Sequence, residues 1–114
     1  MRVGLEVYQE GSEDRAVFRV VGDVDLSTAP LLRDRLQEIT TNTKAVVIDL
    51  SEVAFLDSTG LSVLVATWNR FCATEDHGSF RLVVSRRSIQ RVFDVTGLSD
   101  VFEVFPTLEE AIKG

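Results

Sequence analysis

The feature that most constrains the fold is a change from a strand pattern to a helix pattern in the middle of the chain. The stretch Ala45–Leu50 is mostly apolar and β-branched, which is typical of a strand buried on both faces. A short connection, Ser51–Leu56, is expected to follow. Next, Asp57–Gly60 leads into a helix whose apolar stripe starts at Leu61. Two hydroxyls, a carboxylate and a glycine therefore lie where a strand gives way to a helix, the edge at which α/β sheets meet ligands and partners.

The rest of the sequence predicts further strands and helices in alternation. Alternating patterns over Val3–Tyr8 and Ala16–Val21 flank a polar turn, Glu10–Asp14, so these two strands form an antiparallel hairpin. Later strands are expected at Phe80–Val84 and Phe102–Phe105. The predicted order is ββαβαβαβα, an α/β fold with a mixed sheet, right-handed crossovers and one domain over residues 1–114.

Cap and stop residues place the helices. Ser27 or Thr28 is expected to cap the first helix, with Pro30 in its first turn. Ser85 is expected to cap the third helix, which Gly97 ends.

Charge limits the kinds of partner. The chain has 18 acidic and 12 basic residues and a formal net charge of −6. A surface of this kind does not neutralise a phosphate backbone, and anionic membranes repel it. Neither nucleic acid nor membrane is expected as a direct partner. The start of the sequence lacks the apolar core of a signal peptide, so a cytoplasmic protein is expected.

Several enzyme classes lack their required residues. Leu56 stands where a serine nucleophile elbow needs glycine, and the one histidine, His77, is expected at the far end of the helix that follows Ser58. No phosphate-binding loop ending in Gly-Lys-Ser/Thr is present. The single cysteine, Cys72, excludes an internal disulfide and, with one histidine, a zinc site of the Cys/His type. No catalytic residue, metal site or cofactor is expected.

Two alternative interpretations of the polar residues remain open from the residues themselves. Asp23, Asp25 and Asp57 follow strands that can be neighbours, and three carboxylates could then share a magnesium ion, as in a phosphoacceptor-aspartate receiver domain. Such a domain starts with a βαβ unit and keeps a lysine after its last strand, and this chain has neither. Alternatively, Asp57, Ser58 and Thr59 form a plain helix cap, and the other two aspartates belong to a polar turn.

The chain resembles a known family, the STAS domains, and in particular the bacterial anti-sigma-factor antagonists. Gly22–Asp25 followed by Ser27–Ala29 is similar to the family motif after the second strand. Val47–Ser51 followed by Phe55–Leu61 is similar to its central signature, and Arg91–Leu98 to its third helix. The resemblance covers essentially the whole chain.

The resemblance implies a protein without catalysis of its own. Unphosphorylated, such an antagonist binds an anti-sigma factor that is usually also a serine kinase, and so frees the sigma factor. The kinase phosphorylates the serine that corresponds to Ser58, which releases the antagonist, and a phosphatase resets it. Thr59 is a second hydroxyl, so the choice of acceptor stays open. The expected partner-binding residues are Asp23, Asp25, Asp57, Thr59 and Gly60. A STAS scaffold or transporter-associated module without a switch is the alternative.

Overall fold

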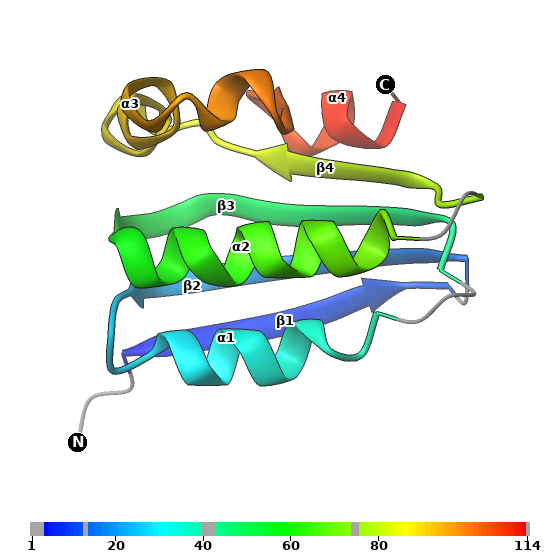
Figure 1. Cartoon of the computed structure of the whole chain (residues 1–114), viewed down its shortest axis with the longest axis horizontal. Coiled ribbons are helices and arrows are strands. Elements are labelled where there is room, and N and C mark those ends of the chain that lie inside the picture. Colours follow the sequence, from blue (N-terminus) through cyan, green and yellow to red (C-terminus); the bar gives the residue numbers. More distant parts are fainter. Residues whose placement is uncertain (1–3, 13, 40–42, 74–75, 114) are drawn as a thin grey trace.

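The fold is a five-stranded sheet with helices on both faces (Figure 1). The computed structural model describes residues 4–12, 14–39, 43–73 and 76–113. The strands are β1 (Leu5–Gly11), β2 (Arg15–Val24), β3 (Ala45–Leu56), β4 (Ser79–Val83) and β5 (Glu103–Phe105). The helices are α1 (Ala29–Leu36), α2 (Ser58–Phe71), α3 (Arg87–Thr96) and α4 (Leu108–Lys113), with a short 3₁₀ helix, Leu98–Asp100, after α3. This confirms the predicted mixed α/β fold and the ββαβαβαβα order.

The strands lie in sequence order across the sheet. β1 pairs with β2 antiparallel, and β2, β3, β4 and β5 pair in parallel. The hairpin and the parallel crossovers are therefore as predicted. The carboxyl ends of β2, β3 and β4 consequently meet at one edge of the sheet, from which α1, α2 and α3 start.

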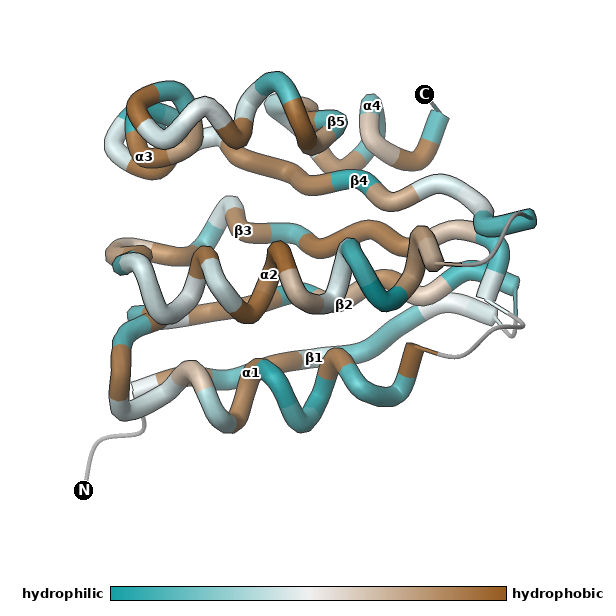
Figure 2. The backbone as a smooth tube through the Cα atoms, in the orientation of Figure 1, coloured by the Kyte–Doolittle hydropathy of each residue, from teal (hydrophilic) through white to brown (hydrophobic). Residues whose placement is uncertain are grey.

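Alternation along the strands builds two unequal cores. On one face, residues such as Phe18, Ile48 and Leu82 are fully buried beneath α1, α2 and α3. On the other face, a smaller cluster of Val17, Val47 and Val83 packs against α4. Helices α1 and α2 lie side by side, and each alternates between hydrophobic and hydrophilic positions along its length (Figure 2).

The predicted connection between β3 and α2 is wrong. Ser51–Leu56 continues β3 and pairs with the end of β2, with Asp23 opposite Phe55 and Val24 opposite Leu56. Irregularities in this register, before Val21 and again between Gly22 and Asp23, interrupt the simple alternation. β-Bulges leave extra residues unpaired, so the sequence pattern no longer has a period of two there.

Two smaller predictions are also corrected. Glu10 and Gly11 belong to β1, so the turn is shorter than expected, and part of it lies outside the described residues, as does Val3. Ser85 does not cap α3: Arg86 is the N-cap residue, and no side chain caps the helix. Gly97 ends α3 in the left-handed conformation, with φ of 80°, as expected for a glycine stop.

Helix α2 lies very close to the sheet at its first turn. A Cβ atom on buried Gly60 would stand 2.6 Å from Leu56 Cδ1 and 2.6 Å from Val24 Cγ1. These two side chains belong to the last residues of β3 and β2. Glycine at this position therefore allows the start of α2 to rest directly on the ends of both strands.

We expect Gly60→Ala to lower the free energy of unfolding by about 1–3 kcal/mol, because the added methyl group overpacks this contact. Urea denaturation measures the change. Ser62→Ala is the control, because Ser62 is exposed on the same helix and alanine is a strong helix former. An unchanged stability of Gly60→Ala would show that α2 can move away from the strands without cost.

Candidate functional site

The site lies where the ends of β2 and β3 meet the start of α2. Val24 is the last residue of β2, and its carbonyl accepts a hydrogen bond of 3.1 Å from the Asp57 backbone N–H. This bond continues the pairing of β2 with β3 one residue beyond the strands. The two loops that follow these strands are thus held next to each other. Asp25 and Asp57 lie in these loops, whereas Asp23 lies near the end of β2, and Ser58 and Thr59 are the first residues of α2.

Asp57 is the N-cap of α2. Its backbone is extended, and its Oδ1 atom accepts hydrogen bonds from the backbone N–H groups of Thr59 (3.0 Å) and Gly60 (3.2 Å). The Thr59 hydroxyl donates a third bond to the same oxygen. Hydrogen bonding, first from the Thr59 hydroxyl and then from the two N–H groups, lowers the pKa of Asp57 below its ordinary value of 3.8. Partial desolvation and the charge of Asp25 oppose this shift.

Ser58 is the first residue of α2 and is exposed. Its carbonyl accepts a bond of 2.9 Å from the Ser62 hydroxyl. Its own hydroxyl has no hydrogen-bond partner within the part of the chain that the structure describes. The Ser58 hydroxyl therefore takes no part in capping the helix and is accessible from solution.

Thr59 and Gly60 play a different part from Ser58. Thr59 is half-buried, and its hydroxyl is engaged with Asp57. Gly60 is buried and shapes the contact between α2 and the strands. Both were predicted to bind a partner, but the buried Gly60 offers little surface to one.

Asp25 organises the loop between β2 and α1. Its Oδ1 atom accepts bonds from the Ser27 hydroxyl (2.7 Å) and from the backbone N–H groups of Ser27 (3.0 Å) and Thr28 (3.1 Å). The Ser27 hydroxyl is the main cause of a lowered pKa of Asp25. Thr28 is the N-cap residue of α1, but its hydroxyl does not cap that helix and donates instead to the carbonyl of Asp23, at 2.8 Å. Asp23 itself is half-buried within β2.

No metal site is visible among the described residues. They contain no group of three His, Cys, Asp or Glu side chains that could hold a metal ion. In both Asp25 and Asp57, the Oδ1 atom already accepts hydrogen bonds from backbone N–H groups nearby in the chain. Elsewhere, burial raises the pKa of the half-buried Cys72 thiol, which disfavours the reactive thiolate.

Two exposed apolar residues at this edge were missed by the sequence analysis. Leu26, in the loop before α1, has 74% of its surface exposed, and Phe55, near the end of β3, has 52%. An exposed side chain of this kind contributes to binding when a partner covers it. Leu26 is visible in the sequence as one apolar residue inside a polar loop. Phe55 was hidden because its segment was predicted to be a connection.

The sequence is similar to a known protein family and to known members of it. A model of the STAS domain family matches residues 6–111. The anti-sigma-F factor antagonist RsfB of Mycobacterium tuberculosis is 39% identical over 101 residues, covering 87% of this chain and 80% of that protein. The anti-sigma-B factor antagonist of Bacillus subtilis is 29% identical over 113 residues, covering 99% of this chain and 100% of that protein.

The fold is also similar to that of a solved structure. The crystal structure of an anti-sigma factor antagonist from Mycobacterium paratuberculosis has a TM-score of 0.86 and 33% sequence identity, covering 96% of this chain and 92% of that chain. Among the described residues, no helix is long and apolar enough to cross a membrane.

We expect Asp57→Asn to lower stability at neutral pH and to have less effect in acid. Asparagine is also a good N-cap, so the substitution removes mainly the charge. The folded-state pKa of Asp57 is lowered, so its charge stabilises the fold fully above pH 3.8. This contribution is lost as the pH falls through the folded-state pKa.

Urea denaturation of wild type and variant from pH 6 to pH 2 measures the effect. The exposed Asp34, on α1, makes no hydrogen bond or ion pair within the described part of the chain. Asp34→Asn therefore reports the general effect of removing one negative charge. A penalty for Asp57→Asn that stays constant over the whole pH range would contradict the charged-cap interpretation.

Proposed function

We propose, because the chain belongs to the STAS domain family, that it is an anti-sigma-factor antagonist controlled by phosphorylation of Ser58. The unphosphorylated form binds an anti-sigma factor that is also a serine kinase, and the bound anti-sigma factor can then no longer hold its sigma factor. Transfer of the γ-phosphoryl group of ATP to the Ser58 hydroxyl ends this binding. A phosphatase removes the phosphate and restores the active form.

The observation that carries the proposal is the separation of roles between Asp57 and Ser58. Asp57 caps α2, whereas the Ser58 hydroxyl is exposed and has no partner among the described residues. A kinase can therefore modify Ser58 without breaking a hydrogen bond of the fold. The neighbouring Thr59 hydroxyl is half-buried and bonded to Asp57, which makes it the poorer acceptor.

The position also tolerates a phosphate. A phosphoserine adds a charge of about −1.5 to −2 at pH 7. The positive end of the α2 dipole stabilises this charge, and the carboxylate of Asp57 opposes it. These two contributions have opposite signs and similar size, so little force remains to displace α2 from the strands beneath it.

The partner, in contrast, experiences the new charge directly. An interface fitted to a neutral hydroxyl must desolvate the phosphate, which costs several kcal/mol unless a cation is present to pair with it. Asp23, Asp25 and Asp57 already make this edge acidic. The names of the M. tuberculosis and B. subtilis relatives, antagonists of anti-sigma-F and anti-sigma-B factors, support an anti-sigma factor as this partner.

We expect Ser58 to be the residue phosphorylated by the cognate anti-sigma kinase with ATP. Peptide mapping by mass spectrometry identifies the site. Ser58→Ala should keep its fold and its binding to the kinase but take up no phosphate, because no hydrogen bond is lost. Thr59→Val is the matched control and should still be phosphorylated. Phosphate mainly on Thr59 or Ser62 would overturn the assignment, and a chain that neither binds nor is phosphorylated would favour a scaffold role.

We expect phosphorylation to act by local charge, without rearranging the fold. Amide NMR shifts should then change around residues 57–61 and near Asp23, and stay nearly fixed at residues 89–93 in α3. The comparison uses the kinase-treated and untreated protein. Broad shifts through α3, or altered hydrogen exchange across the strands, would instead indicate a conformational switch.

A further inference from the structure

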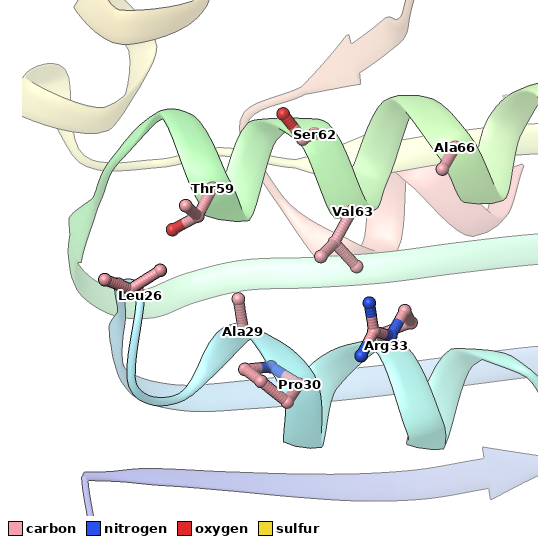
Figure 3. A pocket seen from close by; sticks show the side chains of 8 residues that line it. All are labelled: Leu26, Ala29, Pro30, Arg33, Thr59, Ser62, Val63 and Ala66. Atoms are coloured by element: carbon pink, nitrogen blue, oxygen red, sulfur yellow. The ribbon is translucent and has the colours of Figure 1, made fainter.

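A groove runs between α1 and α2, directly beside the Ser58 site (Figure 3). Its volume is about 400 Å³. We call it the α1–α2 groove. It is lined by Leu26, Ala29, Pro30, Arg33, Thr59, Ser62, Val63 and Ala66. None of these except Thr59 belongs to the residues that the sequence analysis expected to bind a partner.

The lining is apolar along most of its length. Val63 of α2 faces the α1 side of the groove, and Leu26 closes the end nearest to Thr59 (Figure 3). Leu26 has 74% of its surface in contact with water. The small side chains of Ala29 and Ala66 leave room for an incoming side chain. Covering these groups with apolar atoms of a partner releases water and favours association.

The charges at the two ends of the groove have opposite signs. At one end, Thr59 connects the groove to the carboxylate of Asp57 through a hydrogen bond. Further along α1 lies Arg33, which forms no ion pair among the described residues. Its neighbour Arg35, in contrast, is bound to Glu38 and to the carbonyl of Val7. Arg33 is thus an unpaired cation beside an apolar groove on a chain of net charge −6.

We propose that the α1–α2 groove receives an amphipathic helical segment of the anti-sigma factor, with an apolar side chain between the helices and a carboxylate opposite Arg33. This inference rests on the proposed function and identifies the part of the partner that binds. From Thr59 to Ala66 the groove follows α2 for two helical turns, about 10 Å. That length suits one to two turns of a third helix, whose apolar residues at a spacing of three or four face the groove.

The same arrangement fixes the orientation of the partner. A segment with its carboxylate at Arg33 brings its other end to Thr59 and therefore to Ser58. A phosphate on Ser58 then meets the end of a segment that is already anchored. The groove supplies affinity, and Ser58 determines whether that affinity is available.

The test uses the purified anti-sigma kinase that phosphorylates Ser58, with affinities measured by calorimetry in the absence of ATP. Ala66→Trp fills the groove at an exposed position that contacts neither Asp57 nor Ser58 by any hydrogen bond. It should weaken binding by about tenfold or more, as expected when an anchor is excluded. Gln37→Trp is the matched control, because Gln37 is exposed at the far end of α1 and does not line the groove.

Arg33→Glu tests the charge independently. It should weaken binding by about tenfold or more, because it places a carboxylate opposite a carboxylate. Arg15→Glu makes the same change at the start of β2, at the opposite edge of the sheet, and should leave the affinity unchanged. Melting curves of all four variants show whether each is folded at the assay temperature.

The outcomes separate this inference from the proposed function. Weaker binding by both groove variants, with unchanged controls, supports the groove. Wild-type binding and Ser58 phosphorylation together with unaltered affinity of Ala66→Trp and Arg33→Glu overturn the groove and leave the proposed function standing. If the wild-type chain itself neither binds the kinase nor is phosphorylated, both proposals fail.

Discussion

The pairing of β2 with β3 is the interaction on which the rest of the site depends. These strands remain paired to their last residues, Val24 and Leu56, in spite of two register shifts, and the bond from Asp57 N–H to the Val24 carbonyl extends the pairing into the loop. The same two side chains lie beneath Gly60. The end of the β2–β3 pairing therefore fixes how far apart the two loops lie, where α2 starts, and how close α2 lies to the sheet. If the extended pairing were lost, the acidic loop and Ser58 would no longer share one surface.

The different roles of Asp57 and Ser58 at the start of α2 support the proposed regulation by phosphorylation. Helix starts need a side-chain acceptor for their free N–H groups, and a serine often supplies it. Here Asp57 does so. The hydroxyl of Ser58 makes no hydrogen bond among the described residues, so the proposed phosphorylation would break none. Had Ser58 been the cap, phosphorylation would have changed the stability of the helix as well as its surface.

Helices and strands with a regular apolar periodicity could be predicted from the sequence. Bulges, close contacts between elements and the exact cap residues could not. The apolar residues Ala29, Leu32 and Leu36 recur at a helical spacing, and in the structure they form the buried face of α1. The continuation of β3 through Phe55 was missed because bulges break the alternation. Gly60 was predicted to bind a partner, and no local pattern in the sequence shows that a Cβ atom there would collide with side chains from two other elements. The predicted cap at Ser85 is wrong by one residue. The helix α3 begins at Arg87, so Arg86 is the N-cap residue and Ser85 lies just before it.

The electrostatics of the edge determine what kind of partner can use it. Hydrogen bonds lower the pKa values of both Asp25 and Asp57, so these groups stay ionised at any physiological pH. A partner that approaches Ser58 must therefore keep its own carboxylates away from these groups or leave water between the surfaces. Arg33, in the neighbouring groove, favours a partner carboxylate instead. A surface with carboxylates at one end and an unpaired arginine further along the groove discriminates against an acidic partner segment in the reversed orientation. If Ser58 is phosphorylated as we propose, the added negative charge lies at the acidic end, where an interface fitted to the neutral hydroxyl has no cation to pair with it.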